Sequence, residues 1–438
     1  MSIVTDEILE SYSLMLGARL RTGTDKITPT NFNLHKLDNY KVIKKKVQDG
    51  TYKFTRLKKI KLSNKRTVCI PTIRDRLTME ILKDNIKRKY KVRYNHRDII
   101  IKTIIGKLNS GTPFHVIRLD VESFFSSISH SKLLHKLRNT SLLSYSEYEL
   151  IKRILKLSEG NKGVPQGLSV SSILAEIFME SFDGELKRLH PRINYYCRYV
   201  DDIVIFINGH LTKAEETDLR VRLGEVFKNH RLKSNIKKEQ IIKFTSKAKV
   251  GFDYLGYNFC YEDQKLKISI SESKVKKIKE TIDAYFNNFQ QVHKNARLLL
   301  EQIKYITNKK SIYKNGRFLD KRGDLTYYNR KIYYGVIESY KEVGSESELW
   351  SYFDKYIKGK LLICRKKNLL AGGKILRELH SFSFKRNFAQ NNIYKLNKLK
   401  KAELILLLMD LDKSLVRSRL SRENRIQLFG RYFKLVDF

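Results

Sequence analysis

The chain has few of the residues that hold together disulfide-rich or zinc-stapled proteins. Only four cysteines occur in 438 residues, and no Cys-x-x-Cys pair is among them. They are Cys69, Cys197, Cys260 and Cys364. This scatter argues against a structural zinc site and against a disulfide framework. It is typical of a protein of the reducing cytosol.

Long hydrophobic runs are also missing. The segment from Leu404 to Met409 is only the core of a short helix, far from the length that spans a bilayer. The start of the chain does not resemble a signal peptide, because Asp6, Glu7 and Glu10 interrupt it. No internal repeat and no long low-complexity linker is visible. We therefore expect a cytoplasmic protein with no membrane partner.

Acidic residues are scarce relative to basic ones. Lys and Arg number 88 against 46 Asp and Glu, which gives a net charge of +42. So large an excess repels itself unless a counter-charge is present, and it predicts a polyanionic partner such as nucleic acid. Binding to that partner should weaken steeply with salt, because each phosphate contact releases counterions. A basic protein of the membrane surface is the alternative that charge alone leaves open.

Two adjacent carboxylates, Asp201 and Asp202, lie between apolar segments. Tyr195-Tyr196-Cys197 precedes them and Ile203-Val204-Ile205-Phe206 follows. Such runs read as strands, so the acids are expected at the tip of a β-hairpin. Tight hairpins prefer Asn-Gly or Asp-Gly there, and two neighbouring carboxylates repel unless a cation compensates. A solvent-exposed acidic turn is the other interpretation.

A second acid ends an apolar strand upstream. Val116-Ile117-Arg118-Leu119 leads into Asp120, and two aromatic residues follow shortly after. If the two strands are neighbours, Asp120 and Asp201 can bridge two metal ions about 3.5 to 4 Å apart, as in-line phosphoryl displacement requires. Mg²⁺ suits such a site, because it takes oxygen ligands from one or two carboxylates and from substrate phosphates.

Between these acids lies a glycine-bounded turn. Gly163-Val164-Pro165-Gln166-Gly167 leads through Leu168 to Ser171 into an apolar stretch that could cover much of a helix. Such a loop lets backbone approach a nucleotide closely, and Gln166 can supply an amide. Pro-Gln-Gly turns are common, so an ordinary loop is the alternative.

These three segments, in this order, resemble the catalytic palm of reverse transcriptases, and more narrowly their bacterial and group II intron branch. The segment from Arg66 to Arg76 is similar to the fingers of those enzymes, and Phe252 to Tyr257 resembles their primer grip. The resemblance runs from about Lys65 to Phe259. It implies an α+β fold of the right-hand polymerase type, with fingers, a palm, a thumb and a helical C-terminal region. We expect the palm strands near 115–120, 195–206 and 253–259 to form one antiparallel sheet backed by helices.

The resemblance also implies roles for the acids. Asp120 and Asp201 would hold both metal ions, the carbonyl of Val121 would complete one coordination shell, and Asp202 would support the site more than it chelates. The ions would be Mg²⁺, with Mn²⁺ as a substitute. Lys238 best matches the family's lysine near the pyrophosphate, although Lys237 leaves the register open by one residue.

Substrate contacts follow from the same resemblance. Phe125 matches the aromatic residue under the sugar of the incoming nucleotide, where a ring would exclude a 2′-hydroxyl. Arg74, with Lys65 or Arg66, resembles the cations that clamp the triphosphate. The remaining substrate and primer-grip residues are Gln166, Gly167, Tyr254, Leu255 and Gly256. The alternatives are core packing for the phenylalanines and ordinary surface charge for the cations.

We expect four regions along the chain. They are a basic N-terminal extension (1–64), interleaved fingers and palm (65–262), a thumb (263–345) and a helical C-terminal region (346–438). Val275, Ile278, Ile282, Tyr285 and Phe289 recur at three- and four-residue steps, which predicts an amphipathic basic helix in the thumb.

No endonuclease, integrase or RNase H module is recognisable, and the thumb motifs typical of retron enzymes are missing. The class that remains is the stand-alone bacterial reverse transcriptase of phage defence, including the abortive-infection type. The first hypothesis is therefore an RNA-directed DNA polymerase in bacterial antiviral defence. Its partners would be deoxynucleotides, a noncoding RNA template and the DNA product, and it could form a homo-oligomer or bind a partner defence protein.

Two further hypotheses stay open. One is protein-primed or untemplated DNA synthesis, for which the 25 tyrosines offer too many candidate hydroxyls to choose from. The other is a non-enzymatic RNA-binding scaffold on a reverse transcriptase fold.

Overall fold

The computed structural model of the chain describes residues 3–17, 20–61, 67–110, 112, 114–244, 249–262, 265–320, 325–370, 372–395 and 399–437. The chain divides into two compact units. The first comprises residues 1–248 and 316–327, and the second comprises residues 249–315 and 328–438. In the described part of the chain, no helix combines the length and apolar character that crossing a membrane would take.

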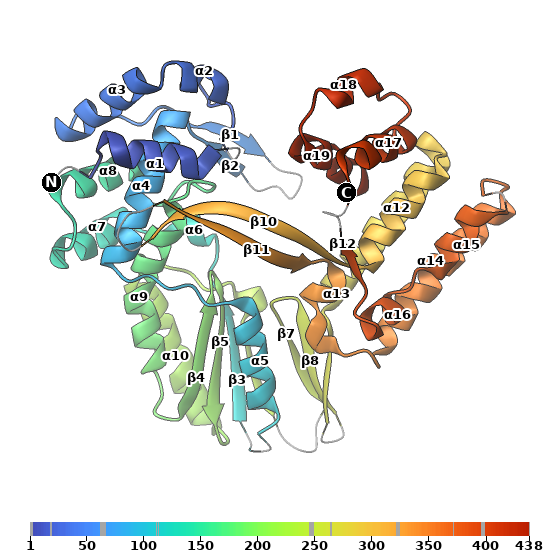
Figure 1. The fold of residues 1–438 in the computed structure, drawn as a ribbon. Helices are drawn as coiled ribbons and strands as arrows, with labels where there is room; N and C mark the ends of the chain where they lie inside the picture. Colours follow the sequence, from blue (N-terminus) through green and yellow to red (C-terminus); the bar gives the residue numbers. More distant parts are fainter. Residues whose placement is uncertain are drawn as a thin grey trace. The chain divides into compact units, whose positions relative to one another are not determined.

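The first unit mixes helices with two antiparallel sheets (Figure 1). Its helices are α1 (Asp6–Leu16), α2 (Pro29–Leu34), α3 (Lys36–Gln48), α4 (Ile73–Lys89), α5 (Arg97–Leu108), α6 (Phe124–Ser127), α7 (His130–Asn139), α8 (Tyr145–Leu155), α9 (Ser171–Lys187), α10 (Lys213–Asn229) and the 3₁₀ turn η2 (Ile236–Lys238). Its strands are β1 (Lys58–Lys61), β2 (Thr67–Ile70), β3 (Phe114–Asp120), β4 (Ile193–Tyr199), β5 (Asp202–Asn208) and β6 (Gln240–Phe244).

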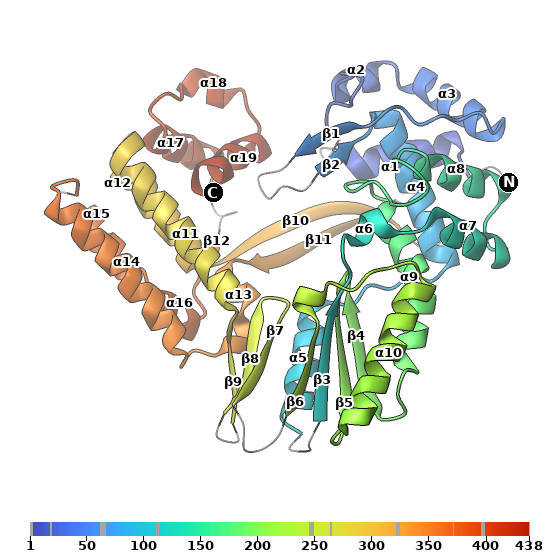
Figure 2. The ribbon, with the colours of Figure 1, turned by 180° about the vertical axis from the view of Figure 1, so that it is seen from behind.

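The four-stranded sheet of this unit has the order β4-β5-β3-β6, and each of its strand pairs is antiparallel. Both of its faces are covered, because Figures 1 and 2, drawn from opposite sides, show α5 over one face and α10 over the other. Successive side chains of a strand point to opposite faces. Ile203 and Ile205 therefore join the core that includes α9 and α10, while Val204 and Phe206 face the other way, and all four are buried. This explains why the run after the acids is apolar at every position.

Helix starts in the first unit follow local capping chemistry. Thr212 caps α10, and its hydroxyl accepts from the amide of Glu215 while the Glu215 carboxylate accepts from the amide of Thr212. Thr72 caps α4 by accepting from the amide of Asp75. Asp75 is buried and accepts from the Tyr52 hydroxyl at 2.9 Å, which ties the segment before β1 to α4.

The second unit packs helices with two small sheets. Its helices are α11 (Glu272–Asn288), the π-helical turn η3 (Phe289–His293), α12 (Ala296–Thr307), α13 (Val336–Ser339), the 3₁₀ turn η4 (Lys341–Val343), α14 (Glu348–Lys366), α15 (Lys374–Ser381), α16 (Phe384–Ala389), α17 (Lys401–Leu411), α18 (Arg417–Ser421) and α19 (Arg425–Val436). Its strands are β7 (Val250–Tyr254), β8 (Tyr257–Glu262), β9 (Lys265–Ile270) and β12 (Ile393–Lys395), together with β10 (Lys309–Leu319) and β11 (Leu325–Tyr334), whose residues 316–327 belong to the first unit.

Several expected elements are present. The amphipathic helix predicted from Val275 to Phe289 is α11 with the turn that follows it, and its stripe is buried at Ile278, Ile282 and Tyr285. The chain after residue 346 is helical apart from the short strand β12. The acids lie where two strands meet through a tight turn, as expected.

One part of the sheet prediction is wrong. Residues 253–259 were expected in the same antiparallel sheet as the acids, but β7 and β8 belong to a separate sheet with the order β7-β8-β9. The fourth strand of the acid-bearing sheet is β6, which pairs with β3. Hydrophobic alternation identifies a strand but says nothing about which partner it takes. The long strands β10 and β11 were not predicted.

Candidate active site

The acids meet at one corner of the four-stranded sheet. β3 ends at Asp120 and β5 begins at Asp202, and the two residues are direct partners in the antiparallel ladder. The amide of Val121 donates to the carbonyl oxygen of Asp201 at 3.2 Å. The strands β3 and β5 are therefore neighbours. A cation site shared by these acids requires this arrangement.

The carboxylates at this corner influence one another. The pKa of Asp202 is raised to about 6, first by burial and then by the negative charge of Asp201. Arg118 lowers this pKa, and Asp120 adds a further increase. The corner therefore carries more negative charge than its surroundings balance, and a cation bound there would relieve the repulsion.

Asp120 is held by the segment around η2. Its carboxylate accepts from Lys238 Nζ at 2.7 Å and from Asn235 Nδ2 at 3.2 Å, and its backbone carbonyl accepts from the Asn235 amide at 2.8 Å. Asp120 is only 4% exposed, so these partners replace water around a buried charge. Between the two adjacent lysines left open by the sequence, Lys238 is the one whose ammonium group contacts Asp120.

The donor set fits a divalent ion that substrate helps to hold. Among the described residues, no group of three or more His, Cys, Asp and Glu side chains forms a ready-made metal cage. Mg²⁺ does not require one, because it is usually bound by one or two carboxylates plus substrate phosphates and water. Asp120 at the end of β3 and Asp201 in the turn before β5 offer such carboxylates, and hard oxygen donors suit this ion.

Left-handed backbone flanks both acid positions. Val200, directly before Asp201, has φ 61°, and Ser123, three residues after Asp120, has φ 49°. A β-branched residue is rarely found there, since its Cβ crowds the following carbonyl. The sequence prediction placed the strained turn on the two acids, whereas the positive φ falls on Val200. The carbonyl of Val200 accepts from Arg198 Nη1 at 2.9 Å.

The glycine-bounded loop packs between two parts of the first unit. The amide of Val164 donates to the carbonyl of Phe125 at 2.8 Å, and the amide of Cys69 in β2 donates to the carbonyl of Gln166 at 2.8 Å. Gly167 has φ 93°, and a Cβ there would clash with Val68 Cγ1. The loop that contains Gln166 and Gly167 is thus hydrogen-bonded to Phe125 through Val164 and to β2 through Gln166.

Of the neighbouring rings, Phe124 is buried and Phe125 is half-buried, with their centroids 5.1 Å apart. The core interpretation therefore suits Phe124, and Phe125 is the ring with an exposed edge.

The fingers cations are only partly covered by the structure. Lys65 and Arg66 lie outside the described residues. Arg74 is the second residue of α4, and its guanidinium lies 3.9 Å from the carboxylate of Asp25 with 36% of the side chain exposed. Its proposed contact with a triphosphate stays a prediction.

The predicted primer-grip residues form the turn between β7 and β8 in the second unit. Tyr254 is fully buried, Leu255 has φ 47° and Gly256 has φ 83°. The carbonyl of Gly256 accepts from the amide of Ser271, just before α11. These three residues therefore form one structural feature, and their role toward a primer stays a prediction.

Two residues that support the acids were missed by the sequence analysis. Asn235 contacts Asp120 through both its side chain and its backbone, and Arg198 holds the turn before Asp201. A signal for Arg198 was present, since a charged residue in a buried strand next to a catalytic turn needs partners. Asn235 carries no such signal, because asparagine is common in loops.

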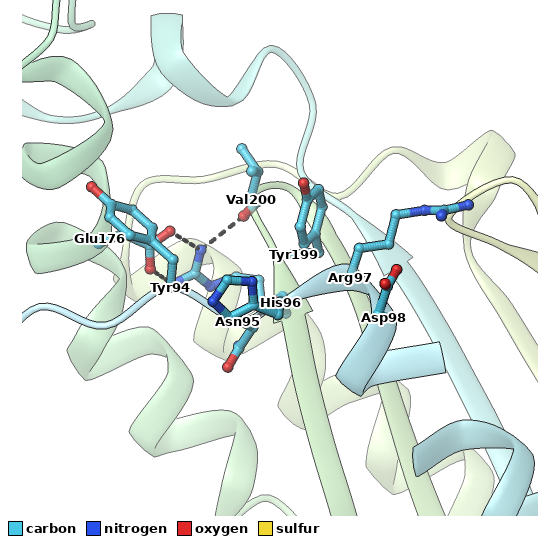
Figure 3. A pocket seen from close by; sticks show the side chains of 9 residues that line it. Tyr94, Asn95, His96, Arg97, Asp98, Glu176, Tyr199 and Val200 are labelled. Carbon is cyan, nitrogen blue, oxygen red and sulfur yellow. Dashed lines mark hydrogen bonds and ion pairs between the residues drawn. The ribbon is translucent and has the colours of Figure 1, made fainter. Parts of the chain in front are cut away.

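A pocket of about 500 Å³ opens beside the turn. Figure 3 shows Tyr94, Asn95 and His96 on one side of it, with Glu176, Tyr199 and Val200 around the remainder. Asn95 Nδ2 donates to the carbonyl of Arg198 at 2.9 Å, so the segment between α4 and α5 is also tied to β4.

Comparison with solved structures gives three telomerases. The telomerase of Candida albicans with a TWJ fragment of telomeric RNA is 13% identical, with a TM-score of 0.38 over 94% of this chain and 64% of that one. The corresponding Candida tropicalis complex is 11% identical, with a TM-score of 0.37 over 95% and 70%. A truncated apo telomerase of Candida tropicalis is 11% identical, with a TM-score of 0.36 over 54% and 60%. The chain thus spans about three fifths of the length of two of these telomerases.

Such low similarity carries no conclusion about activity or partners. No curated protein matches the chain.

The family comparison is more informative, because it covers all three acids and the loop between them. The model of the family described as reverse transcriptase (RNA-dependent DNA polymerase) matches residues 43–259. Its limits enclose β1 to β7 and end within β8, and they include the sheet with Asp120 at the end of one strand and Asp202 at the start of its neighbour. Residues 43–259, just under half of this chain, thus match the model of a reverse transcriptase domain.

Proposed function

We propose that this protein is an RNA-directed DNA polymerase that extends a 3′-hydroxyl with deoxynucleotides at the corner formed by Asp120, Asp201 and Asp202. The observation that carries the proposal is the pairing of Asp120 with Asp202 across adjacent strands inside a reverse transcriptase domain. The net charge of +42 supports a nucleic-acid partner.

Asp120 and Asp201, with the carbonyl of Val121, would hold two magnesium ions, and Asp202 would stabilise their arrangement. When bound, the ions would lower the pKa of the primer hydroxyl and neutralise charge on the departing pyrophosphate. Lys238, whose ammonium group already lies at this corner, would donate a proton to the leaving group. Catalysis would then rest on positioning and electrostatics, with no covalent enzyme intermediate.

The residues around the acids would select the substrate. The exposed edge of Phe125 would lie under the sugar and exclude a 2′-hydroxyl, and Gln166 and Gly167 would line the same nucleotide position. Arg74, with Lys65 or Arg66, would bind the triphosphate, since guanidinium groups suit bidentate contacts to phosphate. Tyr254, Leu255 and Gly256 would hold the primer.

For the biological role, we propose antiphage defence in bacteria with a noncoding RNA as template. Support comes from the resemblance to stand-alone bacterial enzymes and from the helical region that follows the reverse transcriptase domain. Protein-primed or untemplated synthesis and an RNA-binding scaffold are the alternatives.

Sequencing the nucleic acid that copurifies with the protein, or that it makes from deoxynucleotides, tests these alternatives together. DNA complementary to a bound RNA is the expected result. Repetitive or protein-linked DNA would favour untemplated synthesis, and RNA with no DNA product would favour the scaffold. Asp201→Ala should abolish the product, and Asp38→Asn, which neutralises an exposed acid on α3, is the matched control.

A further inference from the structure

Arg198 is a buried cation directly beside the turn that carries Asp201. It is the sixth residue of β4 and is 5% exposed. Its strand position places it on the α9 side of the sheet, opposite the face of Asp202, so it does not serve as a counter-ion at the acid corner itself. A buried guanidinium is costly unless all of its donors are satisfied.

Every N–H group of this guanidinium has a partner. Nε donates to Asp183 Oδ1 at 2.8 Å, and Nη2 donates to Asp183 Oδ2 at 2.9 Å. Glu176 accepts from Nη1 at 3.1 Å and from Nη2 at 2.6 Å. Glu176 and Asp183 lie seven residues apart on α9, which is close to two helical turns, so both face β4. Four of the five donors of the side chain thus anchor it to one helix.

The fifth donor leaves this anchor and reaches the catalytic turn. Nη1 also donates to the carbonyl oxygen of Val200 at 2.9 Å. That carbonyl belongs to the peptide bond that joins Val200 to Asp201. Because the peptide is planar, the direction of the carbonyl fixes the orientation of the Asp201 amide and the position of its Cα. On the other side of the same residue, the Asp201 carbonyl accepts from the amide of Val121. Asp201 is therefore fixed by one hydrogen bond before it and one after it.

The turn needs this support, because its backbone is strained. The left-handed conformation of Val200, with φ 61°, is unfavourable for a residue with a Cβ. Strain of this kind persists only where the surroundings over-determine the conformation. The side chain of Asn95 adds to the restraint by donating to the carbonyl of Arg198 at 2.9 Å.

We infer that Arg198 is a positioning residue for the polymerase reaction, because it transfers the rigidity of α9 to the Val200 carbonyl and so holds the Asp201 carboxylate where a divalent ion binds. The inference rests on the proposed function, since it assigns Arg198 a part in shaping that metal site. Arg198 would act through the backbone of the turn, by its contact with the Val200 carbonyl.

The test is Arg198→Lys, which keeps the charge but loses the five planar donors. Binding of Mn²⁺ to the folded protein, followed by electron paramagnetic resonance, reports on the metal site without requiring activity. We expect the apparent Kd for Mn²⁺ to rise about tenfold, as is common for residues that orient metal ligands. The Mg²⁺ concentration for half-maximal primer extension should rise by the same factor, so that added Mg²⁺ restores much of the rate.

Asn95→Ala is the second variant, and it keeps the inference testable if Arg198→Lys does not fold. Asn95 is exposed, so its loss leaves the core intact while it frees the Arg198 carbonyl. A smaller rise of the Mn²⁺ Kd, about two- to fivefold, is expected. Asn139→Ala, an exposed residue of α7, is the matched control and should leave the Kd unchanged.

The outcomes separate the inference from the proposed function. A lower melting temperature with an unchanged Mn²⁺ Kd in both variants would mean that Arg198 is only a core ion pair, and this would overturn the inference. Asp201→Asn serves as the reference for loss of the site. If Asp201→Asn binds Mn²⁺ as well as the wild-type protein does, or if neither binds it, the proposed metal site is absent. The inference then fails together with the proposed function.

Discussion

Two tight hairpin turns in the described part of the chain satisfy the same geometric demand with different residues. Between β7 and β8, Leu255 and Gly256 both have positive φ, and glycine is suited to such a position. Between β4 and β5, the positive φ falls on Val200 and the next residue is Asp201. The first turn has glycine at one of its two left-handed positions, whereas the second has a β-branched residue at its left-handed position.

The difference shows that the turn at Val200 is locally less stable than the turn at Leu255-Gly256. The carbonyl of Gly256 accepts from the amide of Ser271, whereas the carbonyl of Val200 accepts from a buried arginine that two acids of α9 anchor. At the acid corner next to it, burial raises the pKa of Asp202 to about 6, and the negative charge of Asp201 adds to the increase. Strain and uncompensated charge at one place are typical of a functional site.

The largest effect should come from removing an acid beside the strained turn. Asp120→Asn should lower the rate of primer extension by about 10³-fold, because an electrostatic ligand is lost at the reacting centre. Asp202→Asn should lower it less, since that residue supports the site. Single-turnover extension on an RNA template measures both. Equal losses in the two variants would contradict the division of roles between them.

Although Asp202→Asn should lower the rate of primer extension, it should raise the free energy of unfolding. The raised pKa of Asp202 means that its charged form destabilises the fold above pH 6. Without metal, the variant should therefore gain about 1 kcal/mol at pH 8, a fraction of what a shift of about two pKa units allows. Thermal unfolding in a chelator checks this, and no gain would mean that the repulsion is already relieved.

Another left-handed residue of the first unit, Ser123, lies two positions before Phe125, the residue proposed to select the sugar of the nucleotide. Phe125→Ala should raise ribonucleotide incorporation by about tenfold or more, because the cavity would then admit a 2′-hydroxyl. Primer extension with paired ribo- and deoxynucleotides measures the ratio. Phe124→Leu, a change at the buried neighbour, is the control. Unchanged sugar discrimination in Phe125→Ala would remove this assignment.

Exchanging glycine between the two turns tests the strain directly. Gly256→Ala should lower the stability of the second unit by about 1 to 2 kcal/mol, since alanine at φ 83° is strained. The added Cβ would also meet Tyr340 Oη at 2.9 Å. The single tryptophan, Trp350, is buried in the second unit, so its fluorescence follows this transition.

Val200→Gly should change the stability of the first unit by less than about 0.5 kcal/mol, because relief of strain offsets the lost packing of a half-buried side chain. Hydrogen exchange of the β4 and β5 amides measures this. A loss as large as that of Gly256→Ala would show that the left-handed valine is not strained.

The last prediction concerns a buried charge in the interior of the second unit. Lys310 is 4% exposed, and its Nζ donates to the Tyr305 carbonyl at 2.8 Å. Burial lowers the pKa of Lys310 to about 7, although the charge of Asp437 raises it. The unfolded chain therefore binds more protons than the folded one between pH 7 and about 10.4, and the stability of this unit should rise with pH in that window.

The slope should be at most about 1.4 kcal/mol per pH unit. Urea unfolding followed by Trp350 fluorescence at pH 7, 8 and 9 measures it. Lys310→Met, which keeps the length but removes the charge, should be more stable at pH 7 and should flatten the profile. A profile that stays unchanged in Lys310→Met would assign the pH dependence to other groups.

Local patterns identified much of the fold and the main parts of the site. The apolar runs on each side of Asp201 and Asp202 predicted the hairpin, and the step of three and four from Val275 to Phe289 predicted α11. They could not predict that β6 completes the sheet in place of β7 and β8, because strand pairing is decided by long-range packing. The role of Arg198 could not be predicted for the same reason, since its partners lie 15 and 22 residues away on α9.

By itself, the sequence determined that a strongly basic chain carries three carboxylates at strand ends, since charge and hydrophobic period are properties of neighbouring residues. The tertiary structure alone decided that Asp120 and Asp202 face one another across adjacent strands, that Lys238 lies against Asp120, and that α9 holds the turn through Arg198. These contacts join residues up to 118 positions apart. Only the folded chain makes them, because closing such distances depends on the burial of the whole core.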